Sequence, residues 1–134
     1  MKLLLGTPAL LWWLSDDPRL GDKARARIAD PRHVVLVSAV SLFEITQAIR
    51  LGTLEAEIRD ILQAVEGGGC TWLDLRPEHL RMLRKLPPGP GRQDPFGPLL
   101  IAQAMAEQAT LVSDDPEVPR VMMRFMRCGD APER

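Results

Sequence analysis

Short apolar runs alternate with amphipathic stretches along this chain of 134 residues. The apolar runs are too short for helices and are bounded by Gly, Pro or Asp, which is typical of buried strands. They lie at residues 2–5, 34–37, 71–75 and 110–113. Helices are predicted between them, at about residues 8–14, 21–29, 38–51, 54–65, 77–85 and 95–108. A short helical piece near 116–120 and an edge strand within 121–126 complete the pattern.

Several polar residues are placed to begin these helices. Thr7 followed by Pro8 is a typical helix start, with the Thr7 hydroxyl as the N-cap. Either Ser38 or Ser41 can cap the helix that follows the second strand. The spacing Ser41-x-x-Glu44 also fits a capping box, in which the Glu44 side chain binds backbone at the helix start.

Strands that alternate with helices predict an α/β fold, a three-layer α/β/α sandwich on a mainly parallel sheet of four to five strands. In such sheets, ligands bind at the carboxyl ends of the strands. The predicted strand ends bring Gly6 and Thr7, Ser38, and Ser113 to Asp115 to one edge. We expect one domain over residues 1–128 and a frayed tail over 129–134.

Composition narrows the class of protein. Hydrophobic residues make up 46% and charged residues 26% of the chain, with a net charge of −1, so it folds as an ordinary globule without a strongly cationic surface. Any contact with RNA or DNA must therefore come from a local patch. One basic concentration can touch phosphate or simply form a solvated helix face: Arg76, Arg81, Arg84, Lys85 and Arg92.

The first residues imitate a secretory signal only in part. Gly6-Thr7-Pro8 interrupts the apolar run, and no small-residue cleavage site follows. No apolar run approaches the roughly 20 residues that a membrane span needs. Cys70 and Cys128 match no metal-binding spacing and give no support for a disulfide. A cytoplasmic protein without membrane contact is expected.

Glu44 is the most informative candidate residue. On a helix it shares an apolar face with Val40 and Ala48, with Ser41 at the margin. A carboxylate in such a face is costly unless it finds a partner or a metal. The capping box and a functional role are therefore both open from the pattern alone.

Three aspartates join Glu44 as candidates. Asp114 and Asp115 follow the fourth strand and Asp94 precedes Pro95, where each can serve only as a turn or cap residue. At the carboxyl edge of a sheet, however, the four carboxylates could hold Mg²⁺ or Mn²⁺. Metal held in this way is the arrangement used for phosphodiester hydrolysis.

For the other polar residues the sequence indicates a functional role less specifically. The hydroxyls at the same edge, those of Thr7, Ser38 and Ser113, are candidates for binding a substrate. No serine lies in a Gly-x-Ser-x-Gly context, so a serine hydrolase is not predicted. His33 and His79 lie far from any plausible nucleophile and are expected at the surface.

Four segments resemble PIN-domain proteins of the VapC toxin type. They are residues 2–14, 37–45, 94–104 and 110–116, in the family's order, and the resemblance covers about residues 1–125. It implies an α/β/α sandwich and a Mg²⁺-dependent endoribonuclease that cuts structured cellular RNA. It also implies a homodimer and a co-expressed antitoxin protein as partner. Carried over by position, Glu44 and Asp115 fit the second and fourth metal-binding acids, and Asp94 fits an additional acid.

The other two acidic positions of that family are replaced. Gly6 and Gly97 stand where the resemblance implies the first and third acids, and Pro8 stands in place of a frequent histidine. Glycine supplies no ligand, so Mg²⁺ or Mn²⁺ should bind weakly, to Glu44 and Asp115 with help from Asp94 or Asp114. Two hypotheses follow. One is a weakened ribonuclease, and the other is a silent pseudo-nuclease that acts as a dimerisation and antitoxin-binding module.

Overall fold

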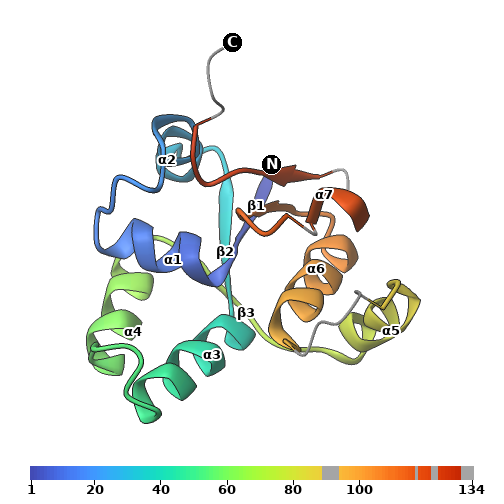
Figure 1. Cartoon of the computed structure of the whole chain (residues 1–134). Coiled ribbons are helices and arrows are strands. Elements are labelled where there is room, and N and C mark those ends of the chain that lie inside the picture. Colours follow the sequence, from blue (N-terminus) through green and yellow to red (C-terminus); the bar gives the residue numbers. More distant parts are fainter. Residues whose placement is uncertain (89–93, 117, 122–123, 131–134) are drawn as a thin grey trace.

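The computed structural model describes residues 1–88, 94–116, 118–121 and 124–130. Within them lies a sheet with the strand order β3-β2-β1-β4-β5 (Figure 1). Its strands are β1 (Lys2–Leu5), β2 (Val34–Ser38), β3 (Thr71–Leu73), β4 (Thr110–Val112) and β5 (Phe125–Met126). Every pairing between them is parallel, which confirms the predicted α/β sandwich on a parallel sheet.

Helices connect the strands and cover both faces of the sheet (Figure 1). They are α1 (Thr7–Leu14), α2 (Asp22–Ala29), α3 (Ala39–Arg50), α4 (Ile58–Gly67), α5 (Pro77–Lys85), α6 (Phe96–Ala106) and α7 (Val118–Val121). No helix in these described ranges is long and apolar enough to cross a membrane.

Alternation along β1 separates the two halves of the core. Leu3 and Leu5 point to one face and pack with buried residues of α1, α2, α3 and α4. Leu4 points to the opposite face and packs with Ile101 of α6 and Val118 of α7. All three leucines are fully buried, which explains why the strand is continuously apolar instead of alternating with polar residues.

Some element boundaries differ from the sequence prediction. The helix after α3 begins at Ile58 and not near residue 54, because Leu54 and Ala56 pack against the core in a non-helical segment. Strand β3 ends at Leu73, and Leu75 beyond it is exposed. Leu54 and Ala56 thus find their packing contacts outside regular structure, whereas Leu75 is an apolar residue left at the surface, and periodicity along the chain reveals neither.

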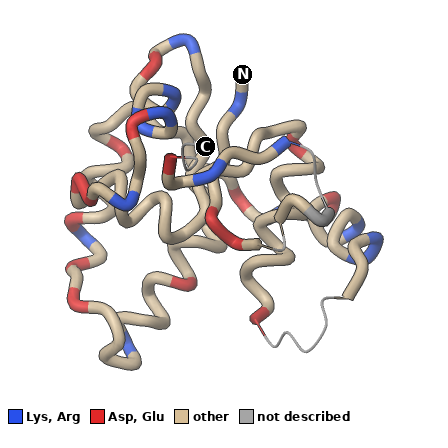
Figure 2. Tube along the Cα trace, turned by 45° about the horizontal axis from the view of Figure 1, so that its top comes forward, with Lys and Arg blue, Asp and Glu red and all other residues tan. Residues whose placement is uncertain are grey.

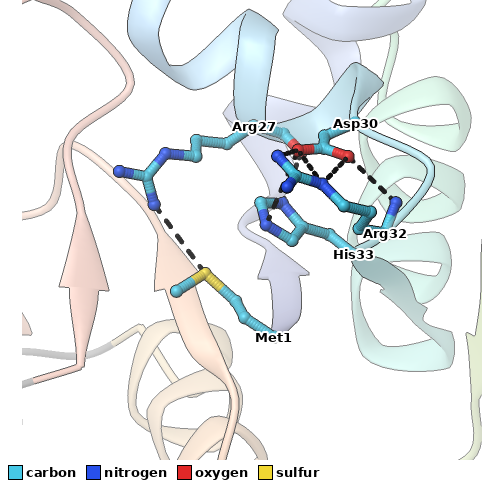
Figure 3. A network of polar contacts seen from close by, with 5 residues as sticks. All are labelled: Met1, Arg27, Asp30, Arg32 and His33. Atoms are coloured by element: carbon cyan, nitrogen blue, oxygen red, sulfur yellow. Dashed lines mark hydrogen bonds and ion pairs between the residues drawn. The ribbon is translucent and has the colours of Figure 1, made fainter.

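The amino-terminal edge of the sheet carries a polar network (Figure 3). His33 was expected at the surface, but its side chain is largely buried and its Nδ1 lies 2.9 Å from the carbonyl oxygen of Arg27. Arg32 forms a two-pronged ion pair with Asp30, and this hydrogen bonding holds the pKa of Asp30 well below its usual range. The network joins the end of α2 to the start of β2, at the edge opposite the strand ends that were predicted to form a site.

The end of the chain packs back on the fold. The Asp130 carboxylate lies 3.4 Å from the first backbone amides of α2, those of Asp22 and Lys23. Its neighbour Gly129 donates its amide to Asp114 Oδ1 at 3.4 Å. Residues 129 and 130 of the predicted frayed tail thus make contacts, and residues 131–134 lie outside the described residues.

Charge is spread over the molecule. Figure 2 shows acidic and basic positions interspersed along the trace, in keeping with the net charge of −1. The described members of the basic concentration lie at or within α5 and are exposed: Arg76, Arg81, Arg84 and Lys85. None of these four lines the cavity at the candidate site, and Arg92 lies outside the described residues.

Candidate functional site

A cavity of about 330 Å³ opens where β1 and β4 end. These neighbouring strands send their connections in opposite directions, because the sheet order places β2 on one side of β1 and β4 on the other. Such a switch point is where ligands bind in open parallel sheets. The lining residues are Gly6, Thr7, Pro8, Trp12, Glu44, Asp94, Gly97, Leu100, Leu111, Ser113, Asp114, Asp115 and Val118.

The cavity brings together nearly all the residues that the sequence singled out. The acids Glu44, Asp94, Asp114 and Asp115 all line it, although they come from α3, the start of α6 and the end of β4. Gly6, Pro8 and Gly97, where the resemblance implies two acids and a histidine, line it as well. Ser38 does not, although it was a candidate for substrate binding.

Glu44 is held by hydroxyl groups. Thr7 Oγ1 donates to Glu44 Oε1 at 2.7 Å, and the same Thr7 oxygen lies 3.0 Å from Ser41 Oγ. Both hydroxyl residues are buried. Thr7 therefore serves Glu44 and is not the N-cap of α1, a position taken by Gly6. The sequence did not predict the contact between the Thr7 and Ser41 hydroxyls. It did place Ser41 and Glu44 one helix turn apart, so that both side chains can lie on the same face of the helix.

The predicted capping box is wrong. Helix α3 begins at Ala39, with Ser38 as its N-cap, so Ser41 and Glu44 lie beyond the first helical residues. Burial raises the pKa of the Glu44 carboxyl, the hydrogen bond from Thr7 lowers it, and the Asp94 carboxylate raises it further. A carboxyl group whose pKa is raised in a cavity is a feature of functional sites.

The three aspartates of the cavity make different hydrogen bonds to their surroundings. Asp94 Oδ1 accepts the Phe96 amide at 2.9 Å, which orders the start of α6. Asp114 Oδ1 accepts the Cys128 amide at 2.7 Å and so anchors the segment after β5. The backbone amide of Asp115 donates to Ser113 Oγ at 3.0 Å, which fixes the turn that presents its side chain. Asp114 is therefore in part a structural anchor.

Gly6 stands in a crowded place. A Cβ atom added there would lie 2.9 Å from the carbonyl oxygen of Val112, the same oxygen that accepts the Gly6 amide at 2.9 Å. The φ of Gly6 is −65°, so the backbone itself suits any residue. The obstacle to a side chain is the close approach of β4, and relieving it requires a backbone shift.

An apolar wall completes the cavity. Trp12, Leu100 and Val118 are among the residues that line it. Arg19 lies over the Trp12 ring, with its guanidinium carbon 4.8 Å from the ring centroid. This cation–π contact and the pair with Asp17 hold Arg19 beside α1.

The carboxylates of the cavity suit a weakly bound Mg²⁺ better than a metal site in which several carboxylates coordinate one ion closely. Mg²⁺ prefers carboxylate oxygens, keeps several waters, and is often bound by one or two carboxylates together with a substrate phosphate. Glu44 and Asp115 can supply these, with Asp94 beside them. Within the described residues, however, the cavity acids do not include three whose ligand atoms all come within 4.8 Å of one another.

A second group of residues does place three ligand atoms within 4.8 Å of one another, outside the cavity. It consists of Glu78, His79 and Glu107. His79 was expected at the surface but is fully buried. Its Nδ1 accepts the Arg76 amide at 3.0 Å, so its proton sits on Nε2, which lies 2.9 Å from Glu107 Oε2. A metal on Nε2 would have to displace this proton and leave an imidazolate, which makes the group a poor metal centre.

The comparisons with known proteins agree with the fold. The family model described as "PIN domain" matches residues 3–122. Among solved structures, the chain is similar to a chain of VapBC2 from Rickettsia felis bound to a DNA fragment from their promoter. The TM-score is 0.69 at 16% identity, over 95% of this chain and 98% of that chain. No curated protein matches the chain.

Proposed function

The chain belongs to the PIN domain family, and from this premise we propose that it is a VapC-like toxin protein with a weakened, Mg²⁺-dependent endoribonuclease site. The proposal includes a cytoplasmic homodimer with residues 1–128 as its PIN-like domain and an antitoxin protein as partner. A structural relative that carries the name VapBC2 supports this class of system. The substrate would be cellular RNA.

One observation carries the nuclease proposal. Glu44, Asp94 and Asp115 line a single cavity at the switch point of a parallel sheet, although 71 positions of sequence separate the first from the last (115 minus 44). Carboxylates gathered in this way favour a hard divalent cation. Such a cation supplies Lewis-acid stabilisation of a phosphate and a more acidic bound water.

The residues of this chain have distinct parts in the proposal. Glu44 and Asp115 would hold the cation as the catalytic carboxylates of the site, and Asp94 and Asp114 would add negative charge. Thr7 keeps the Glu44 carboxylate in place through its 2.7 Å hydrogen bond. Ser113 lines the cavity and is left as the hydroxyl candidate for contact with substrate. Activity is weak because Gly6 and Gly97 offer no oxygen.

The crowding at Gly6 favours a second candidate, a silent binding module. A Cβ at Gly6, where the resemblance implies a first acid, would lie 2.9 Å from the Val112 carbonyl oxygen of β4, which supports a site that has no room for that acid. A groove of about 530 Å³ adjoins the cavity through Trp12, which lines both. It has an apolar floor that includes Leu11, Leu14 and Ile61.

Acidic residues outnumber basic ones around that groove. Arg19 pairs with Asp17 there, which leaves Glu55, Glu57 and Asp60 as the acids that no basic residue of the lining pairs with in an ion pair. An amphipathic segment with apolar anchors and basic side chains complements such a surface, because apolar contacts supply affinity and opposite charges supply orientation. We assign this groove to the antitoxin in both candidate functions.

Cleavage of RNA with and without millimolar Mg²⁺ or Mn²⁺ tests the choice. The variants are Glu44→Gln, Gly97→Asp, and Gly97→Asp combined with Gly6→Asp. We expect slow, metal-dependent cleavage by the parent, at least a tenfold loss in Glu44→Gln, and a gain in Gly97→Asp. Adding Gly6→Asp should bring no further gain, because its Cβ meets the Val112 carbonyl. Glu66→Gln, the same change at an exposed position of α4, is the matched control.

The outcomes separate the two candidates. If neither the parent nor Gly97→Asp cleaves RNA, and both proteins are folded, the result supports the binding module. Cleavage that persists undiminished in Glu44→Gln contradicts the assignment of the cavity as the nuclease site.

A further inference from the structure

A buried chain of hydrogen bonds runs behind the cavity. Ser38, His79 and Gln103 are all fully buried and polar, and none of them lines the cavity. Together with Glu107 they link the end of β2, the start of α5 and the length of α6. Three buried polar side chains in one core require that every donor finds an acceptor.

The direction of each bond follows from its fixed backbone partners. His79 Nδ1 accepts the Arg76 amide, so the ring donates from Nε2 to Glu107. The Gln103 amide nitrogen lies 3.2 Å from the same Nδ1 and 3.4 Å from the carbonyl oxygen of Asp74, and both of these can only accept. The Gln103 amide is therefore oriented with its nitrogen toward α5.

The orientation of the Gln103 amide determines which hydrogen bonds the Ser38 hydroxyl makes. Gln103 Oε1 faces the Ser38 hydroxyl, which donates to it. The Ser38 oxygen is then left to accept the Val40 amide at 2.9 Å, and this is the N-cap bond of α3. A Gln103 amide turned the other way would set its oxygen against the Asp74 carbonyl and the Nδ1 lone pair. The cap of α3 is thus held by a residue of α6.

We propose that Gln103 is a positioning residue of the site, one that locks the N-cap of α3, the helix carrying Glu44, to α5 and α6. Helix α6 begins two residues after Asp94, so the same side chain ties together two acidic walls of the cavity. The proposal goes beyond the proposed function, because it holds whether or not the cavity binds a metal or cleaves RNA.

Two substitutions at this position separate its two contacts. Gln103→Met keeps the approximate volume and removes both hydrogen bonds. Gln103→Glu keeps an acceptor for Ser38 but sets a carboxylate oxygen against His79 Nδ1. Gln63→Met, the same chemical change at an exposed position of α4, is the control. Amide hydrogen exchange and ¹⁵N NMR of the His79 ring are the measurements.

In Gln103→Met we expect the Val40 amide to exchange about tenfold faster relative to the amides of Leu4 and Leu36, since a lost cap is worth roughly that factor. Gln103→Glu should restore Val40 protection to within about threefold of the parent, because its carboxylate still accepts the Ser38 hydroxyl. The parent ring should carry its proton on Nε2. Gln63→Met should change none of these.

A general loss of stability would accelerate all three amides together, and that result overturns the proposal. An Nδ1-protonated ring in the parent also overturns it, because the Gln103 amide would then be free to turn. That measurement needs no variant and decides the question even where Gln103→Met does not fold.

Discussion

Gly6→Ala tests whether strand β4 leaves room for a side chain at this position. At an unstrained position such as this one, with φ near −65°, replacing Gly by Ala ordinarily stabilises a protein by about 0.4–1 kcal/mol through the unfolded state. Here the new Cβ lies 2.9 Å from the Val112 carbonyl oxygen, a rigid backbone atom. Overpacking of this kind costs about 1–3 kcal/mol. The net expectation is a loss of about 1–2 kcal/mol.

The corresponding change in Tm can be calculated. An unfolding entropy of about 2.1 cal/mol/K per residue gives roughly 0.28 kcal/mol/K for 134 residues, so Tm should fall by about 4–7 °C. Differential scanning calorimetry measures this directly. Gly67→Ala in α4 is the matched control, because an added Cβ there meets nothing within 4 Å. It should raise Tm slightly. A Tm for Gly6→Ala equal to or above that of the parent would refute the crowding argument.

Three further predictions concern the cavity acids. Since the pKa of Glu44 is raised by burial, its favourable contribution to stability is fully present below about pH 4.5 and is lost as pH rises through the raised value. Glu44→Gln should therefore raise Tm at pH 7 but not at pH 4 in calorimetry, and a lower Tm at pH 7 contradicts this. Thr7→Val removes the hydrogen bond that lowers this pKa, so ¹³C NMR should show it rising further, whereas Thr7→Ser should leave it near the parent value. Burial and the Asp114 charge raise the pKa of the Cys128 thiol to about 12, so iodoacetamide should not label it at pH 8 in the native protein. Asp114→Ala releases the Cys128 amide and should speed labelling at least tenfold, while the exposed control Asp60→Ala should not.

The fold could be predicted from the sequence because its strands carry a strong local signal. Val35 to Val37 and Leu3 to Leu5 are buried on both faces of the sheet, so they form unbroken apolar runs between residues that end strands. Parallel pairing then follows from the helical crossovers. The cavity could be placed for the same reason, since its polar residues follow directly after strand ends.

Contacts between distant residues could not be predicted in the same way. His79 looks like a surface residue of an amphipathic helix, yet it is buried because Glu107 and Gln103, more than 20 positions away, satisfy both ring nitrogens. Ser38 was a candidate for substrate binding because it ends a strand, but its hydroxyl faces Gln103 in the core. Neither partner lies within reach of a pattern that compares residues a few positions apart.

Glu44 shows how a local motif can be correct in letters and wrong in structure. The spacing Ser41-x-x-Glu44 describes a capping box only if Ser41 starts the helix, and Ser38 already occupies that place. One turn further along, the same two side chains face inward and meet Thr7 from the end of β1. The carboxylate that a capping box would have tied to the backbone is instead held at the cavity. For this reason Glu44 is available at the cavity for the proposed function, although Gly6 and Gly97 supply no carboxylate there.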